Sequence, residues 1–290
     1  MKGLKIVVLA KQVPDTRNVG KDAMKADGTV NRAALPAIFN PEDLNALEQA
    51  LRLKDTIKGT TVHVLTMGPG RAAEIIREAM YRGADGGYLL SDRAFAGSDT
   101  LATSYALSCA LRNLEYDVII CGRQAIDGDT AQVGPQVAEK LGLPQVTYAE
   151  EIQKCDGKTI TIKRRLERGI EVVTSPLPCV VTVNGSAAVC RPRNARFVMK
   201  YKNAKGTQEA QDANEDYFAL VNERPYLKLT EWSVNDIKSN PEDLGLSGSP
   251  TKVKNIESVV FQAKEAKVLS CTDCEIDDMM KELITNHTIG

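Results

Sequence analysis

The run LKIVVLA at residues 4–10 decides the fold class of this chain. Apolar and β-branched side chains without polar alternation are typical of a strand that is buried on both faces of a parallel sheet. Three further runs of this kind follow, TVHVLT at 61–66, GYLLS at 87–91 and YDVIIC at 116–121. Because helix signals separate these runs, the sequence predicts an α/β domain with a mostly parallel sheet, right-handed crossovers and helices on its faces.

Start and stop signals mark the predicted helices. The first begins at Asn40-Pro41, where Asn40 can cap the helix and Pro41 suits its first position. The others are predicted over residues 71–82 before Gly83, from Ser98-Asp99-Thr100 onward, and over residues 130–141 before Gly142.

Beyond Pro144 the chain changes to alternating runs broken by Asp156-Gly157 and Arg168-Gly169, which predicts hairpin strands added to the same sheet. PCVVTV at 178–183 is predicted as another buried strand. From residue 200 onward the chain is polar, and its few apolar anchors are YLKLTEW at 226–232, residues 259–261 and DDMMKELITNH at 277–287. We therefore expect a domain over residues 1–200 and an extended C-terminal arm over residues 201–290 that lies on a partner chain.

Composition excludes several classes of function. The chain has 37 Lys and Arg residues against 38 Asp and Glu residues, so it lacks the basic surplus of a general nucleic-acid binder. No run approaches the roughly 18 apolar residues that span a bilayer, and the opening segment lacks a signal-peptide cleavage site. We expect no membrane span. Seven cysteines, an odd number, suit a reducing compartment, and we expect the cytoplasm.

Metal chemistry has little support in the sequence. His63 and His287, the two histidines, do not pair with a cysteine or a carboxylate at ligand spacing. Cys271 and Cys274 form a lone CxxC, whereas zinc or an iron–sulfur cluster needs about four ligands. We expect free thiols and no metal, with a redox dithiol as the alternative.

Ligands of open α/β sheets bind beyond the carboxyl ends of the strands, so the loops of interest are residues 10–12, 67–70, 96–100 and 122–132. The last two combine small residues, hydroxyls and helix N-termini, which suit a diphosphate because free N–H groups and the helix dipole favour an anion. The alternative is that Ser98 and Thr130 only cap helices and that the glycines only serve turns. Neither GxGxxG nor a P-loop lysine is present, so the residues alone indicate an adenine-nucleotide-like site.

Four ordered motifs carry a family resemblance: KIVVLAKQVPD at 5–15, FNPEDLNALEQALRLKD at 39–55, GRQAIDGDTAQVGPQVAEKLGLPQVTY at 122–148 and RRLERGIEVVTSPLPCVVTV at 164–183. Together they make residues 3–200 resemble the β (small) subunit of electron transfer flavoproteins. The resemblance implies a Rossmann-like nucleotide-binding domain over residues 1–200. It also implies a heterodimer with an α subunit that carries its own FAD, which the C-terminal arm would wrap.

The resemblance further implies which residues face an adenine nucleotide at the carboxyl edge of the sheet. They are Leu9, Ala10, Lys11, Asn40, Pro41, Asp43, Thr66, Met67, Gly68, Asp99, Thr100, Thr103, Arg123, Gln124, Ala125, Ile126, Asp127, Gly128, Asp129, Thr130, Ala131, Gln132, Val133 and Gly134. Among them, Gln124, Asp127 and Asp129 are candidates for positioning the cofactor or its phosphates. No side chain is expected to act as a catalytic acid or base, because the cofactor does the chemistry.

Members of this family hold either AMP or a second FAD in the β subunit. The chain reads IDGDTAQV where the AMP group tends to carry acidic residues followed by Cys-Asn-Gln-Thr, and its AGSDTLATS resembles the electron-bifurcating group. Gly128 removes a side chain and a potential negative charge near the anion. The resemblance therefore favours FAD, with structural AMP as the alternative.

In the FAD reading, NAD(H) is the electron-donor substrate. NADH would reduce the β-subunit flavin, one electron would go to ferredoxin or flavodoxin, and the other would go through the α-subunit FAD to a flavoprotein dehydrogenase. In the AMP reading, the subunit would pass dehydrogenase electrons onward without bifurcation.

The family's partner-recognition loop corresponds to CRPRNARFVMKYKNAKG at 190–206. Ala195 or a near neighbour stands where the family has an anchoring leucine, and we expect Phe197 to be the one large apolar side chain of the loop. The resemblance implies a dehydrogenase partner of the acyl-CoA type, or of a lactate or other 2-hydroxy-acid type. The alternative is that the loop contacts nothing.

Overall fold

The computed structural model describes residues 2–15, 36–211, 215–251, 268–270, 272–286, 288 and 289. The chain divides into two compact units, Met1–Lys254 and Asn255–Gly290. In the second unit the described helix is α8 (Asp273–Thr285). The apolar run at 259–261, the first cysteine of the CxxC pair (Cys271) and His287 lie outside the described residues. No helix in the described part of the chain combines the length and the apolar character that crossing a membrane requires.

A nine-stranded sheet organises the first unit, in the order β11-β5-β4-β1-β6-β10-β7-β8-β9. All neighbouring strands from β11 to β7 are parallel, and β7, β8 and β9 pair antiparallel. The strands are β1 (Lys5–Leu9), β4 (Thr61–Met67), β5 (Gly86–Leu90), β6 (Val118–Gly122), β7 (Gln145–Cys155), β8 (Thr159–Leu166), β9 (Gly169–Pro176), β10 (Cys179–Val183) and β11 (Thr230–Trp232). The predicted α/β class with a mostly parallel sheet and added hairpins is confirmed. A short antiparallel pair, β2 (Gln12–Pro14) and β3 (Ala37–Phe39), forms a separate sheet.

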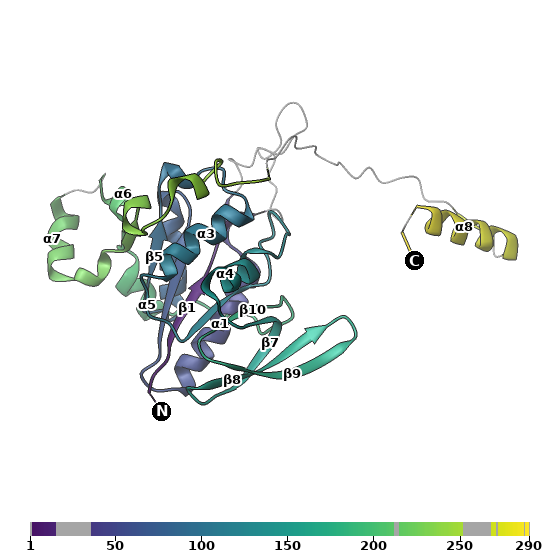
Figure 1. Ribbon diagram of the computed structural model, residues 1–290, viewed down its shortest axis with the longest axis horizontal. Helices are drawn as coiled ribbons and strands as arrows, with labels where there is room; N and C mark the ends of the chain where they lie inside the picture. Colours follow the sequence, from purple (N-terminus) through teal and green to yellow (C-terminus); the bar gives the residue numbers. More distant parts are fainter. Residues whose placement is uncertain are drawn as a thin grey trace. The chain divides into compact units, whose positions relative to one another are not determined.

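Helices cover both faces of the sheet (Figure 1). Ile6 and Val8 of β1 belong to the core that includes helix α1, whereas Val7 and Leu9 belong to the core that includes α3 and α4. This alternation follows from the two-residue period of a strand, and both faces are apolar because both are covered. The helices of this unit are α1 (Pro41–Thr56), α2 (Ala73–Arg82), α3 (Thr100–Leu111), α4 (Val133–Leu141), α5 (Ala195–Tyr201), α6 (Thr207–Ala210) and α7 (Glu215–Glu223), and the short 3-10 helices are η2 (Gly70–Ala72), η3 (Arg93–Phe95), η4 (Pro225–Leu227), η5 (Val234–Asp236) and η6 (Pro241–Asp243).

The ends of the helices follow the sequence signals in most places. Asp99 caps α3, since its carboxylate accepts from the N–H groups of Leu101 and Ala102 at 2.9 and 3.0 Å. Gly83 and Gly142 end α2 and α4 with φ values of +122° and +64°. Thr130 caps nothing, because α4 starts at Val133 and the chain is not yet helical at residue 130. Asn40 stands before α1, but its side chain makes no capping hydrogen bond.

Residues 201–251 form part of the first unit, whereas the sequence led us to expect an arm from residue 201 onward. Tyr201, Leu227 and Leu229 are buried against the outer side of α2. Arg77 of α2 pairs with Glu209 at 2.6 Å, and β11 extends the sheet beside β5. The sequence did not reveal this packing because the apolar anchors are isolated and widely spaced among polar residues. The compact unit ends at Lys254.

Candidate functional site

The carboxyl ends of three neighbouring strands form the centre of the candidate site. β1 lies between β4 and β6, so the chain runs outward from β1 to β4 and β5 and then returns to β6 on the other side. This reversal is a topological switch point, where ligands of open α/β sheets bind. The structure therefore brings together the three predicted segments at residues 9–11, 66–68 and 123–134.

Asp43 of α1 ties two of these strand ends together. Its Oδ2 accepts the N–H of Lys11 at 2.9 Å, and its Oδ1 accepts the N–H of Gly122 at 2.9 Å. A Cβ atom on Gly122 would lie 2.5 Å from that Oδ1, so the close approach requires glycine. Burial raises the pKa of Asp43 to about 7, although the two backbone donors favour its ionised form. Because both oxygens serve backbone donors, Asp43 shapes the edge of the sheet.

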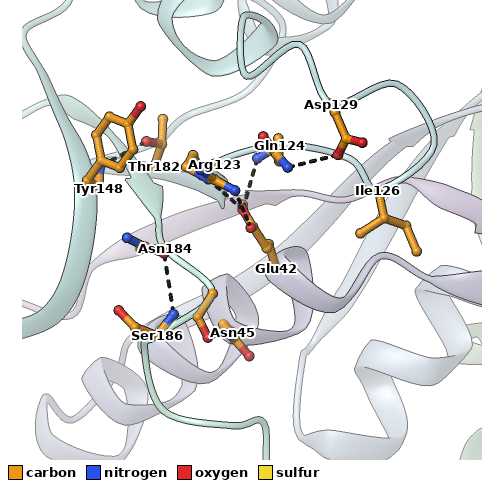
Figure 2. Close-up of polar contacts among 12 residues, drawn as sticks. Glu42, Asn45, Arg123, Gln124, Ile126, Asp129, Tyr148, Thr182, Asn184 and Ser186 are labelled. Atoms are coloured by element: carbon orange, nitrogen blue, oxygen red, sulfur yellow. Dashed lines mark hydrogen bonds and ion pairs between the residues drawn. The ribbon is translucent and has the colours of Figure 1, made fainter. Parts of the chain in front are cut away.

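Asn40 and Glu42 hold the start of the loop that follows β6. Asn40, fully buried, donates to the carbonyl of Gln124 at 2.8 Å and accepts the N–H of Ile126 at 3.2 Å. Glu42 accepts the N–H of Gln124 at 3.1 Å and pairs with Arg123 at 3.0 Å (Figure 2). These bonds explain why Asn40 does not cap α1: its side chain is used across the edge of the sheet instead.

The outer part of the loop folds back on itself and on β1. Lys11 Nζ lies 2.8 Å from both carboxylate oxygens of Asp127, and Gln124 Nε2 donates to Asp129 Oδ1 at 2.8 Å. Asp129 and Ala131 have φ values of +51° and +53°, in the left-handed region. This backbone keeps residues 129–131 out of helix α4, and the N–H of Asp129 closes a turn by donating to the carbonyl of Ala125 at 2.9 Å.

Gly128 occupies the most open position of this loop. A Cβ atom added there would meet nothing within 4 Å. Gly134 differs, because a Cβ atom there would lie 2.7 Å from Thr182 and 2.8 Å from Cys121. The first turn of α4 therefore lies directly against β6 and β10, with its N-terminus at the carboxyl edge of the sheet.

Thr66, the penultimate residue of β4, has a buried hydroxyl group. The side chain is 0% exposed, and Oγ1 has no hydrogen-bond partner among the residues that the structure describes. The N–H of Gly68 donates a hydrogen bond to the carbonyl of Leu90 at 3.0 Å. A buried hydroxyl without a partner is costly, so Thr66 is distinct from the other residues of this edge.

The start of α3 joins the same edge through one side-chain contact, Thr100 Oγ1 to Gln132 Oε1 at 2.9 Å. Asp99 is committed elsewhere, because its Oδ2 accepts from the hydroxyl and the N–H of Thr251 at 2.7 and 3.1 Å. These hydrogen bonds lower the pKa of Asp99 although partial burial acts against them. Asp99 thus anchors the segment around Thr251. The N–H of Thr103 donates to the Asp99 carbonyl within this helix.

Two residues of the edge were missed by sequence reasoning as parts of the site. Glu42 lies in the first turn of α1, where an acidic residue is favourable in any helix, so its sequence position alone does not indicate bonds across the edge. Tyr148, whose ring lies over Arg123, carries no local signal because its contact depends on a strand pairing.

The segment before and along α5 is held by ion pairs to α1 and α2. Arg191 pairs with Glu48 at 2.9 Å, and Arg193 pairs with Glu78 at 2.6 Å. Phe197, the large apolar side chain that the sequence singles out in this loop, packs partly buried against the core beside α2. Met199 is the exposed large apolar side chain of α5, at 65%.

Comparison with known proteins places the chain in a family. A model of the electron transfer flavoprotein domain matches residues 27–215. The chain belongs to the electron transfer flavoprotein family, as a β subunit. It is 43% identical over 294 residues to the acryloyl-CoA reductase electron transfer subunit gamma of Anaerotignum propionicum, covering 99% of this chain and 100% of the relative. The electron transfer flavoprotein subunit beta of Megasphaera elsdenii is 41% identical over 297 residues, covering 99% and 100%.

A third relative of this β subunit is the caffeyl-CoA reductase-Etf complex subunit CarD of Acetobacterium woodii, 44% identical over 251 residues and covering 86% of this chain. The family resemblance carried by the four sequence motifs is confirmed. The names of these relatives also include two reductase complexes.

Proposed function

We propose that this β subunit binds FAD at the carboxyl edge of its sheet and works in an electron-bifurcating flavoprotein. The observation that carries the proposal is Gly128, the open position in the loop after β6. A side chain at this position would occupy the space in front of the loop, and an acidic one would repel a diphosphate. The loop of this chain leaves that space free.

The residues present fit a dinucleotide. The cations nearest the loop are already neutralised, since Lys11 pairs with Asp127 and Arg123 pairs with Glu42. Anion binding would therefore depend on the N-terminus of α4 and on the loop N–H groups beyond Asp129, since those of Gln124, Ile126, Gly128 and Asp129 already donate within the protein. The buried hydroxyl of Thr66 offers a further contact that lacks a protein partner in the described part of the chain.

When bound, the isoalloxazine would accept a hydride from NADH and release single electrons, one to ferredoxin or flavodoxin and one to the FAD of the α subunit. The chain's own residues would bind and orient it. Asn40 and Glu42 hold the start of the loop, and Asp43 keeps the ends of β1 and β6 in place. Catalysis then depends on position and environment, and we assign no acid or base.

The partner in this proposal is an electron transfer flavoprotein α subunit, held by helix α8. Within α8, Ile276, Met280 and Ile284 recur every four residues and are 43%, 41% and 55% exposed. Side chains at this spacing share one face of a helix. An apolar face of this kind suits a groove on another protein.

We further propose a flavoprotein dehydrogenase as the electron acceptor beyond the α subunit. The relatives named for acryloyl-CoA and caffeyl-CoA reductase support the acyl-CoA type over a lactate or other 2-hydroxy-acid type. Met199 is the apolar side chain that would contact it. Burial of such a side chain is worth about 1.5 to 3 kcal/mol, enough to anchor a transient complex.

Nucleotide content tests the proposal against its alternative. The αβ complex is purified, denatured with acid, and the released nucleotides are identified by chromatography. We expect two FAD per αβ pair and no AMP. One FAD with one AMP would support the conventional electron carrier and contradict the bifurcating one.

A further inference from the structure

Tyr148 adopts a backbone conformation that is unusual for an aromatic residue. Its φ is +58°, in the left-handed region that is favourable for glycine and unfavourable for L side chains. The pairing of β7 with β10 shifts at this point, because Val146 lies opposite Val181 whereas Ala149 lies opposite Val183. β7 therefore carries one extra residue here. Such bulges redirect a side chain, and left-handed residues of this kind persist only where the surroundings hold them.

The bulge directs the ring of Tyr148 over Arg123. The guanidinium carbon lies 5.9 Å from the ring centroid, within the range of a cation–π contact. The N–H of Tyr148 donates to Thr182 Oγ1 at 3.3 Å, so the shifted backbone keeps a hydrogen-bond partner. The residue is 37% exposed, so burial of its ring does not account for the strained backbone.

Arg123 links Tyr148 to the residues that hold the loop. It forms two bonds to Glu42, Nη2 to Oε1 at 3.0 Å and Nε to Oε2 at 3.4 Å. The same Oε2 accepts the N–H of Gln124 at 3.1 Å. In Figure 2 Arg123 lies between Tyr148 and Glu42, and Gln124, which also bonds to Glu42, is turned toward Asp129. The first two residues of the loop are therefore held by side chains from α1 and β7.

We propose that Tyr148 is a positioning residue for the nucleotide of the β subunit. Its ring holds Arg123 against Glu42, and this pair fixes the start of the loop whose N–H groups bind the diphosphate. The strained backbone is the means by which β7 places an aromatic ring at this point. The inference rests on the proposed nucleotide site and adds a residue to it that neither the fold nor the sequence motif singles out.

Two variants separate this role from a purely structural one. Tyr148→Gly removes the ring and also relieves the strain, because glycine adopts a positive φ readily. Tyr148→Phe keeps the ring and removes only the hydroxyl. Both are prepared as αβ complexes, with two readouts: the thermal midpoint of the nucleotide-stripped complex, and the rate at which nucleotide leaves the loaded complex.

We expect one nucleotide per αβ pair to leave Tyr148→Gly about fivefold faster than the wild type, with a thermal midpoint that is equal or higher. Tyr148→Phe should match the wild type in both readouts. Release of nucleotide from Tyr148→Gly at the wild-type rate would overturn the role of Tyr148 but not the proposed function. The same holds if release is faster but the thermal midpoint of the stripped complex falls, because lost stability would then explain the faster release. A Tyr148→Phe variant that behaves like Tyr148→Gly would also overturn it. A wild-type complex without nucleotide in its β subunit would overturn the proposed function as well.

Discussion

Asp43 accepts a hydrogen bond at 2.9 Å from the N–H of Gly122, a residue 79 positions further along the chain. The other oxygen of the same carboxylate accepts from Lys11 at the end of the neighbouring strand. One buried side chain therefore sets the spacing of the two strands between which the chain reverses its direction across the sheet. The geometry of the candidate site depends on this contact.

Asp43→Asn should destabilise the fold by about 1 to 3 kcal/mol, because an amide NH₂ then faces one of the two N–H donors. The effect should depend on pH. The folded pKa of Asp43, about 7, lies above its ordinary value, so the native state binds a proton more readily than the unfolded chain. The stabilisation of the fold by protonated Asp43 is complete at pH values below about 4 and is lost as the pH rises through about 7.

The difference in stability between the wild type and Asp43→Asn should therefore be largest near pH 4 and should shrink toward pH 8. Thermal midpoints of the two complexes across this range give the difference directly, and other titrating groups cancel in the comparison. A difference that grows with pH would contradict the assigned effect of burial.

Gly128→Asp should weaken nucleotide binding without harming the fold. A side chain at this position meets no protein atom within 4 Å, so the thermal midpoint of the stripped complex should stay within about 1 °C of the wild type. The added charge should weaken FAD binding by about tenfold or more through repulsion of the diphosphate. Gly128→Ala is the matched control, with bulk but no charge, and it should bind more tightly than the aspartate variant. Equal flavin content in all three complexes would count against the position of the loop beside the diphosphate.

Thr66→Val tests whether the buried hydroxyl binds ligand. Valine keeps the shape of threonine and removes an oxygen that has no partner in the described part of the chain. The stripped complex should become more stable, by about 1 kcal/mol, because an unsatisfied buried group is lost. Nucleotide affinity should fall by about tenfold if the hydroxyl donates to the ligand. A gain in stability with unchanged affinity would exclude Thr66 from the contact.

Met199→Ala should slow electron transfer to the partner dehydrogenase several-fold and leave flavin content unchanged. The residue is 65% exposed on α5, so its loss should hardly alter folding. Leu246→Ala is a suitable control, since this side chain is similarly exposed, at 61%, and lies outside α5. Stopped-flow mixing of each reduced αβ complex with the oxidised dehydrogenase gives the rates. Equal rates for both variants would remove Met199 from the interface.

The sequence allowed the sheet and most helix ends to be predicted because these features depend on local patterns. Continuous apolar runs such as residues 4–10 require burial on two faces, and Gly83 and Gly142 supply the left-handed residue that ends a helix. Family motifs predicted the strand ends that the structure brings to one edge.

The remaining features depend on contacts between residues far apart in the chain. The side chain of Asn40 does not cap α1 as expected. It forms hydrogen bonds with the backbone of Gln124 and Ile126, which lie 84 and 86 positions further along the chain. Tyr148 reaches Arg123 only because β7 bulges beside β10. The anchors of residues 201–251 are single side chains such as Leu227 and Leu229, and their burial depends on the outer face of α2. Local pattern carries no information about these pairings.

The central claim is that the carboxyl edge of this sheet holds a flavin that NADH reduces. Anaerobic titration of the αβ complex with NADH, followed by visible absorbance, tests it most directly. We expect two flavins per αβ pair to be bleached. A complex in which NADH bleaches no flavin, or in which the pair contains a single flavin together with AMP, would contradict the account.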